Sequence, residues 1–279
     1  MKLRLWHAAD GTRVAYREAG AGPALVLLHS ALLTHREWEP AVEHLTHRFR
    51  LVLPDLPLHG DSEDRPRHPY TLPWYVEVMS AFSEATAGPR PLVGGHGMGA
   101  EILLHAATAG RLRPARLVLT PTRLHGTRVG ERRHRAWRLA ARAGAVPGLD
   151  RALTHAARAT FRPRWGEELS ARANPAARDL VRHAFADVGG NANLARAWAR
   201  HVRRWPAGAD PKLLDAYAAL DCPVLLLWAG ADSHYPVAAA EEALARLPDG
   251  QLRVLAGSGY LIAYDDPVAL ARELIAFCG

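Results

Sequence analysis

Residues 91–101, with the sequence PLVGGHGMGAE, constrain the fold of this chain more than any other stretch. A short apolar run meets a glycine cluster, and a helical pattern follows over residues 102–107. An apolar run that ends in glycines is typical of a buried strand that turns sharply into a helix. The stretch therefore predicts a strand, a tight turn and a helix in immediate succession.

Strand-like and helix-like segments alternate along most of the chain, which is typical of a parallel sheet with helices on both faces. Residues 3–8 and 12–19 alternate apolar and polar side chains around Asp10 and Gly11, which predicts an opening hairpin. Further strands are expected within residues 23–29, 51–54, 91–95, 115–120, 223–229 and 251–255, and helices within residues 34–47, 70–87 and 237–247 and after Pro267. The chain therefore belongs to the α/β class, with a mostly parallel eight-stranded sheet.

Residues 122–206 interrupt this alternation. They hold no strand-like run, and breaks at residues 146–148 and 189–190 separate helical segments rich in alanine and arginine. We expect an inserted helical lid between two parts of one core, residues 1–121 and 207–279. Its tryptophans either line an apolar pocket or pack as core residues; they are Trp137, Trp165, Trp198 and Trp205.

The charge of the chain is concentrated in this insertion. The formal net charge is +7, and residues 123–204 hold 18 arginines against 6 acidic residues. This bias favours an anionic small-molecule substrate, or an acidic carrier protein that delivers one. The alternative is a set of solvated helix faces in an arginine-rich chain. No recognition motif accompanies the charge, so we expect no nucleic-acid partner.

Other features narrow the class of protein. Cys222 and Cys278 give no disulfide framework, which fits a reducing cytoplasm. No stretch approaches the roughly 18 apolar residues of a membrane helix, so no membrane partner is expected. The sequence has no phosphate-binding loop and no cluster of metal ligands, so it predicts neither a cofactor nor a metal.

Four segments resemble motifs of the α/β-hydrolase family, and they occur in the family's order. Residues 26–31 (VLLHSA) are similar to the family's His-Gly-x segment, and residues 38–40 (WEP) to its Trp-x-Pro. Residues 54–62 (PDLPLHGDS) resemble its Asp-x-Pro-Gly-His-Gly-x-Ser loop, and residues 95–99 (GHGMG) resemble its Gly-x-Ser-x-Gly elbow. The resemblance implies an α/β-hydrolase fold from about residue 10 to residue 279, with only the lid unassigned.

The same resemblance locates a catalytic triad of which two members are missing. Gly97 stands at the position of the family's serine, and Tyr260 stands at that of its histidine. Asp232 matches the acid that orients the histidine. Because loss of the serine or the histidine costs on the order of 10⁶ in turnover, an efficient serine hydrolase is not expected.

The oxyanion-binding half of such a site consists of backbone groups and needs no particular side chain. The resemblance implies that the N–H groups of Ala31 and Met98 are the two donors. Ser30 replaces the family's usual glycine in this loop. A glycine at position 97 is expected to leave open space where the serine would stand, and so to enlarge the pocket.

Three side chains near these positions have competing interpretations, and two histidines have a structural one. Asp232 is either a general base or a carboxylate that only binds loop backbone, and Tyr260 either donates a proton or only fills the place of the histidine. His234 is either a substitute base or a residue of a surface loop. His96 and His29 are expected to be structural, with His29 bracing the oxyanion loop. Together with Ser30 and Gly97, they are expected to line the pocket.

Together these observations favour a non-hydrolytic enzyme. The expected reaction class is a lyase, isomerase or cyclase that acts on an apolar, oxygenated small molecule in specialised, polyketide-like metabolism. One alternative is a catalytically silent binding protein that uses the same pocket. A further alternative is a weak hydrolase in which Asp232 or His234 activates water.

Overall fold

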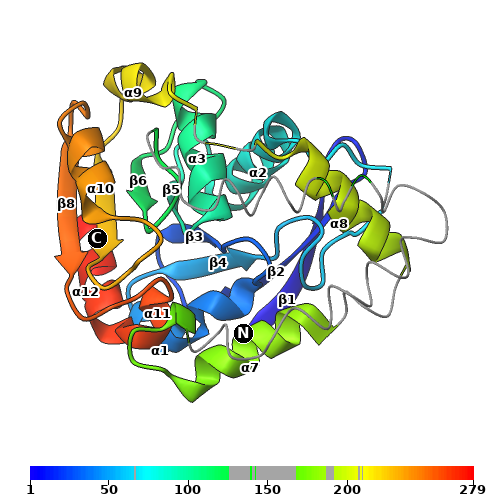
Figure 1. Cartoon of the computed structure of the whole chain (residues 1–279), viewed down its shortest axis with the longest axis horizontal. Coiled ribbons are helices and arrows are strands. Elements are labelled where there is room, and N and C mark those ends of the chain that lie inside the picture. Colours follow the sequence, from blue (N-terminus) through cyan, green and yellow to red (C-terminus); the bar gives the residue numbers. More distant parts are fainter. Residues whose placement is uncertain are drawn as a thin grey trace.

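The computed structural model describes residues 1–65, 67–125, 139, 142, 168–186, 192–206, 208 and 210–279. Eight strands form one sheet in the order β1-β2-β4-β3-β5-β6-β7-β8 (Figure 1). Their bounds are β1 Lys2–His7, β2 Arg13–Ala19, β3 Ala24–Leu28, β4 Arg50–Pro54, β5 Leu92–Gly95, β6 Arg116–Leu119, β7 Val224–Ala229 and β8 Gly250–Leu255. The pairs β1–β2 and β2–β4 are antiparallel and every other pair is parallel, which confirms the predicted class and sheet.

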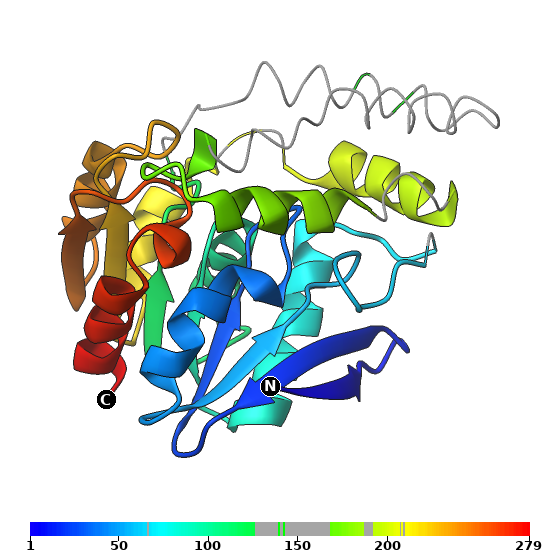
Figure 2. The ribbon, with the colours of Figure 1, turned by 90° about the horizontal axis from the view of Figure 1, so that it is seen from below.

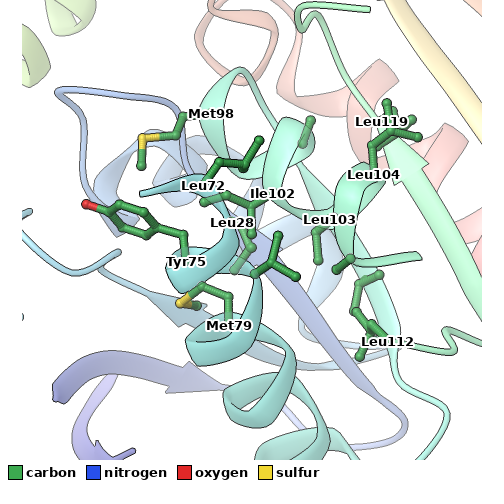
Figure 3. Packing of buried hydrophobic residues seen from close by; sticks show 14 of the residues in the cluster. Leu28, Leu72, Tyr75, Met79, Met98, Ile102, Leu103, Leu104, Leu112 and Leu119 are labelled. Carbon is green, nitrogen blue, oxygen red and sulfur yellow. The ribbon is translucent and has the colours of Figure 1, made fainter. Parts of the chain in front are cut away.

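Helices cover both faces of the sheet because the central strands are apolar on both sides. In β3, Leu25 and Leu27 belong to one hydrophobic cluster, whereas Val26 and Leu28 belong to the other. The first cluster contains side chains of α1 (Glu39–Leu45) and α12 (Pro267–Cys278). The second contains side chains of α2 (Leu72–Ala87), α3 (Met98–Thr108) and α10 (Val237–Leu244). Figure 3 shows Leu72 of α2 beside Ile102 of α3 in this second cluster.

The sequence predicted most element boundaries within a few residues, and the differences have local causes. Thr34 caps a helix as expected, but the segment begins as the 3₁₀ helix η1 (His35–Trp38) and becomes α1 only where Pro40 takes the first turn. The short elements α9 (Leu213–Ala216), η2 (Tyr217–Ala219) and α11 (Ile262–Asp265) were not predicted, since segments of three or four residues carry too little periodicity.

Helices α7 (Pro175–Ala186) and α8 (Ala192–Arg204) lie between β6 and β7 in the chain, and in Figure 2 both run across the same side of the sheet, above the strands. Leu180 and Val181 of α7 pack with Leu33 and Leu261, which follow β3 and β8. Helix α8 packs against the second hydrophobic cluster instead. Trp198 of α8 and Trp205, which directly follows the helix, contact buried side chains there. The expected breaks at residues 146–148 and 189–190 lie outside the described residues, as do the other two tryptophans, at positions 137 and 165.

A membrane-crossing helix would need a long apolar run. None of the helices within the described ranges has the length and apolarity for this.

Candidate active site

The turn between β5 and α3 explains the glycine cluster at residues 94–99. Gly97 has φ 49° and ψ −115°, a left-handed conformation that favours glycine. A Cβ on Gly99 would lie 2.6 Å from the carbonyl oxygen of Leu28, and one on Gly95 would lie 2.6 Å from the backbone nitrogen of Ala100. The turn is therefore so tight that its flanking positions cannot carry side chains, as predicted for a sharp elbow.

The space beside Gly97 is filled, so the expectation of an open space there is wrong. A Cβ on Gly97 would collide with the hydroxyl groups of Ser30 and Tyr260 and would lie 2.9 Å from Ser30 Cβ. These two hydroxyls hydrogen-bond to each other, and we call them the hydroxyl pair. The reason is that Ser30 and Tyr260, which replace a glycine and a histidine of the family pattern, both direct their hydroxyls toward Gly97. Three departures from that pattern thus meet at one point.

Tyr260 is partly buried within a group of aromatic rings. Its ring centre lies 4.1 Å from that of His96 and 5.6 Å from that of Tyr235, with which it stacks. Burial, followed by the nearby Tyr235 and Glu37 side chains, raises the pKa of Tyr260 well above its ordinary value of 10. The phenol therefore stays protonated across the physiological range, and it can donate a hydrogen bond or a proton.

A buried carboxylate that the sequence did not point to lies behind Ser30. Glu37 accepts a hydrogen bond from the Ser30 backbone N–H at 2.7 Å and another from Nδ1 of His96. Glu37 directly precedes the segment that resembles the family's Trp-x-Pro. A single carboxylate near that motif has no partner at a fixed spacing, so only the three-dimensional structure reveals this contact.

Asp232 and His234 lie together in the loop after β7, and His234 lies near Tyr260. The Asp232 side chain is only 1% exposed, and its Oδ1 accepts a hydrogen bond from the His234 backbone N–H at 2.7 Å. Its Oδ2 is buried and has no hydrogen-bond partner among the described residues. The His234 ring is 35% exposed, and its centre lies 6.3 Å from that of Tyr260. The structure thus brings together the three side chains predicted to move protons.

The expected oxyanion donors lie at the ends of two neighbouring strands. Ala31 follows β3, and Met98 begins α3 directly after β5. Neither N–H has a hydrogen-bond partner within the described parts of the chain. The side chain of Met98 is buried in the core beside Leu72 (Figure 3), so the residue is anchored while its N–H stays available. Such an arrangement can stabilise a negatively charged oxygen.

Two buried histidines hold the loop that carries Ala31. His29 Nδ1 lies 2.7 Å from the Ser30 carbonyl oxygen, which belongs to the same peptide unit as the Ala31 N–H. His59 Nε2 accepts from the Leu32 N–H at 3.1 Å, and Leu32 has a left-handed φ of 65°. His29 Nε2 likewise accepts a backbone N–H, at 2.8 Å. Nε2 of each ring must therefore be unprotonated, so the loop depends on both histidines being neutral.

We predict that the protein loses stability as the pH falls from about 6.5 to about 4. Burial lowers the pKa of His29 to about 3 and that of His59 to about 4, from an ordinary value of 6.5. In this window the unfolded chain binds protons that the folded chain does not, so the stability is fully present above pH 6.5 and is lost below it. Denaturant unfolding across this range measures the effect. A free energy of unfolding that stays constant across it would contradict the assignment.

A buried carboxylate also joins the Tyr260 loop to the segment that leads into α7. Asp265 accepts hydrogen bonds from the backbone N–H groups of Gly259 at 2.7 Å and Ala171 at 2.9 Å, and from the Ser170 hydroxyl. A Cβ on Gly259 would lie 2.7 Å from the backbone nitrogen of Ala171, so the two segments are in close contact. Asp265 therefore fixes the path of the loop that positions Tyr260.

Substitution Asp265→Asn is expected to destabilise the protein by about 3 kcal/mol, because an amide nitrogen would face buried N–H donors. The neighbouring substitution Asp266→Asn is the control, since asparagine caps a helix as well as aspartate does and Asp266 caps α12. Thermal or denaturant unfolding compares the two variants. Equal stabilities would show that Asp265 does not hold the loop.

The sheet is mostly parallel, and a left-handed elbow joins β5 to α3 beside two available N–H donors. These features define the class of protein as one with a hydrolase-like fold. Residues 25–273 match the model of the alpha/beta hydrolase family. The chain belongs to this family.

Solved structures share this fold, and two relatives are similar in sequence. An uncharacterized protein of Mycobacterium tuberculosis is 27% identical over 276 residues, which cover 94% of this chain and 77% of that protein. A pimeloyl-acyl-carrier-protein methyl ester esterase of Xanthomonas campestris is 38% identical over 110 residues, 39% of this chain and 41% of the esterase. An alpha/beta hydrolase fold protein from Burkholderia ambifaria superposes with a TM-score of 0.81 at 21% identity, covering 98% of this chain and 97% of its own. A thermophilic esterase from Thermogutta terrifontis has a TM-score of 0.78 at 20% identity, covering 100% and 98%.

Proposed function

We propose that this protein is a non-hydrolytic enzyme, a lyase, isomerase or cyclase, that acts on an apolar, oxygenated small molecule in specialised, polyketide-like metabolism. One observation carries the proposal: the hydroxyl pair fills the space in which a nucleophile on residue 97 would stand. An acyl-enzyme at the elbow therefore has no room to form. The three departures from the family pattern contact one another, which favours a site rebuilt for another reaction over random loss.

The proposed roles follow from the donors and acceptors of the site. The N–H groups of Ala31 and Met98 bind a carbonyl oxygen of the substrate and stabilise the enolate that forms when a neighbouring carbon loses a proton. Asp232 Oδ2, buried and without a partner among the described residues, receives that proton, with His234 next to it. Asp232 then gives this proton to another carbon of the enolate, while Tyr260, whose phenol stays protonated, donates a hydrogen bond to the substrate. Each proton taken is thus balanced by one given.

We propose that residues 122–206 form a lid over a core of residues 1–121 and 207–279. The contact of α7 with Leu33 and Leu261, next to Tyr260, supports this division. The excess of arginine over residues 123–204 supports an anionic or carrier-tethered substrate. The name of the Xanthomonas relative, which includes an acyl-carrier protein, is consistent with such a substrate. A cytoplasmic location is part of the proposal, since the two cysteines give no disulfide framework.

Hydrolysis is the second candidate, because two of the compared proteins are named esterases. In this chain it would require water activated by Asp232 or His234. The Ser30 hydroxyl does not replace the missing nucleophile, since its bonded partner, Tyr260, stays a protonated phenol and cannot take the serine proton.

Labelling with a fluorophosphonate, which reacts with activated serines, separates the two candidates. We expect no labelled serine and no cleavage of a panel of simple esters above the protein-free control. A stoichiometric label on Ser30, or ester turnover that is lost in Asp232→Asn, would establish hydrolysis and exclude the proposed reaction class. A known serine esterase carried through the same protocol verifies the probe.

A further inference from the structure

Glu37 and His96 form a buried acid–histidine pair that the roles above leave unused. Glu37 lies in η1, and His96 lies between β5 and α3. Both side chains are only 3% exposed, and one carboxylate oxygen of Glu37 contacts Nδ1 of His96. The other carboxylate oxygen accepts the backbone N–H of Ser30 at 2.7 Å. A buried carboxylate with two such bonds is held more firmly than a neutral acceptor would be.

This pair reaches both members of the hydroxyl pair. Glu37 holds Ser30 through its backbone N–H, and it holds the His96 ring, whose centre lies 4.1 Å from that of Tyr260 at an angle of 47°. One carboxylate therefore links the residue that carries the first hydroxyl to the ring that packs against the second. Removing the carboxylate would leave the Ser30 N–H and His96 Nδ1 without an acceptor in the interior.

We propose that Glu37 and His96 are positioning residues that hold the Ser30 and Tyr260 hydroxyls in the arrangement used by the reaction. This inference rests on the proposed function for its catalytic consequence, but the arrangement itself can be observed without a substrate. Mispositioning of reacting groups by about 1 Å costs up to about 10²-fold in rate, so the pair has a measurable effect without touching the substrate.

A positioning role of His96 would use a different ring nitrogen from a chemical role. The bond to Glu37 uses Nδ1, while Nε2 is buried and has no hydrogen-bond partner among the described residues. An asparagine at position 96 can donate its amide N–H to Glu37 but has no ring nitrogen to accept a proton. Substitution His96→Asn therefore keeps a donor to Glu37 but removes the ring that packs against Tyr260, whereas His96→Ala removes both.

The test is carbon NMR of protein labelled at the Cζ atom of tyrosine, with Tyr260→Phe assigning the Tyr260 signal. We expect Glu37→Gln and His96→Ala to shift that signal and to slow substrate conversion at least about 10-fold. We expect His96→Asn, which keeps a donor to Glu37 but lacks the ring, to shift the signal and to slow conversion less than His96→Ala does. Glu39→Gln is the matched control, because Glu39 lies in the same segment and is partly exposed.

An unchanged Tyr260 signal in both Glu37→Gln and His96→Ala would overturn the proposal. Loss of conversion in His96→Asn with a wild-type signal would also overturn it, since the ring nitrogen would then act chemically. Shifted signals in a protein whose wild type converts no compound would support the role of Glu37 and His96 in holding the hydroxyl pair and would remove the proposed function alone. The two proposals can therefore fail separately.

Discussion

The triple substitution Ser30→Gly, Gly97→Ser and Tyr260→His is expected to create esterase activity at least about 10²-fold above that of the wild type. It removes both hydroxyls that collide with a side chain at position 97 and supplies the missing nucleophile and base. Asp232 is already in place, and its buried Oδ2, which has no partner in the part of the chain that the structure describes, can accept a hydrogen bond from the introduced imidazole. A complete triad contributes on the order of 10⁶ in turnover, so even a poorly aligned one is detectable. Hydrolysis of a chromogenic acetate ester measures it.

Two matched variants show whether the new activity comes from a triad. Adding Asp232→Asn to the triple variant is expected to abolish most of the gain, because the imidazole then loses the group that orients it. Gly97→Ser alone is expected to remain inactive and to destabilise the protein by about 2 kcal/mol, since its side chain meets the hydroxyl pair. A folded triple variant no more active than the wild type would show that these positions do not form a triad geometry.

Asp232→Asn in the otherwise unchanged protein is expected to reduce conversion of its substrate about 10²- to 10⁴-fold, the usual contribution of a general base. The carboxamide preserves size and can still accept the His234 N–H, but it cannot receive a proton. Initial rates measured by mass spectrometry, with substrate binding measured separately, give the loss in the chemical step. A normal rate would assign the proton transfer to another group.

Asp221→Asn is the matched control for that measurement. Asp221 lies before β7 and is exposed, whereas Asp232 follows the same strand and is buried. The control changes the same charge by the same chemistry, so a difference between the two variants reports the position of the carboxylate and not the net charge of the protein.

The fold could be predicted from the sequence because its determinants are local. The apolar runs of β3, β5 and β7 are continuous, as strands covered on both faces require, and each helix that follows has its own periodicity. The glycines at 95 and 99 identify the elbow because backbone contacts exclude other residues there, and Gly97 has the left-handed φ of the turn. Short elements such as α11 escaped prediction because packing, and not periodicity, determines them.

The site could be predicted only in part. Family motifs located Asp232, Tyr260 and the two N–H donors, but the hydrogen bond between Ser30 and Tyr260 joins residues 230 positions apart. No spacing rule links such a pair. The sequence therefore indicated an empty space at Gly97, where the fold brings two hydroxyls together. The contacts of Glu37 could not be predicted for the same reason, since its partners, Ser30 and His96, follow two different strands.

The central claim is that this site converts a small molecule without an acyl-enzyme. The most direct measurement incubates catalytic amounts of the pure protein with metabolite extract of its own producer and follows every species by mass spectrometry. We expect many moles of one compound to be converted per mole of protein, to an isomer or a dehydrated product. A compound retained at about one mole per mole and released unchanged would contradict the claim and identify a binding protein, and products that gain the elements of water would identify a hydrolase.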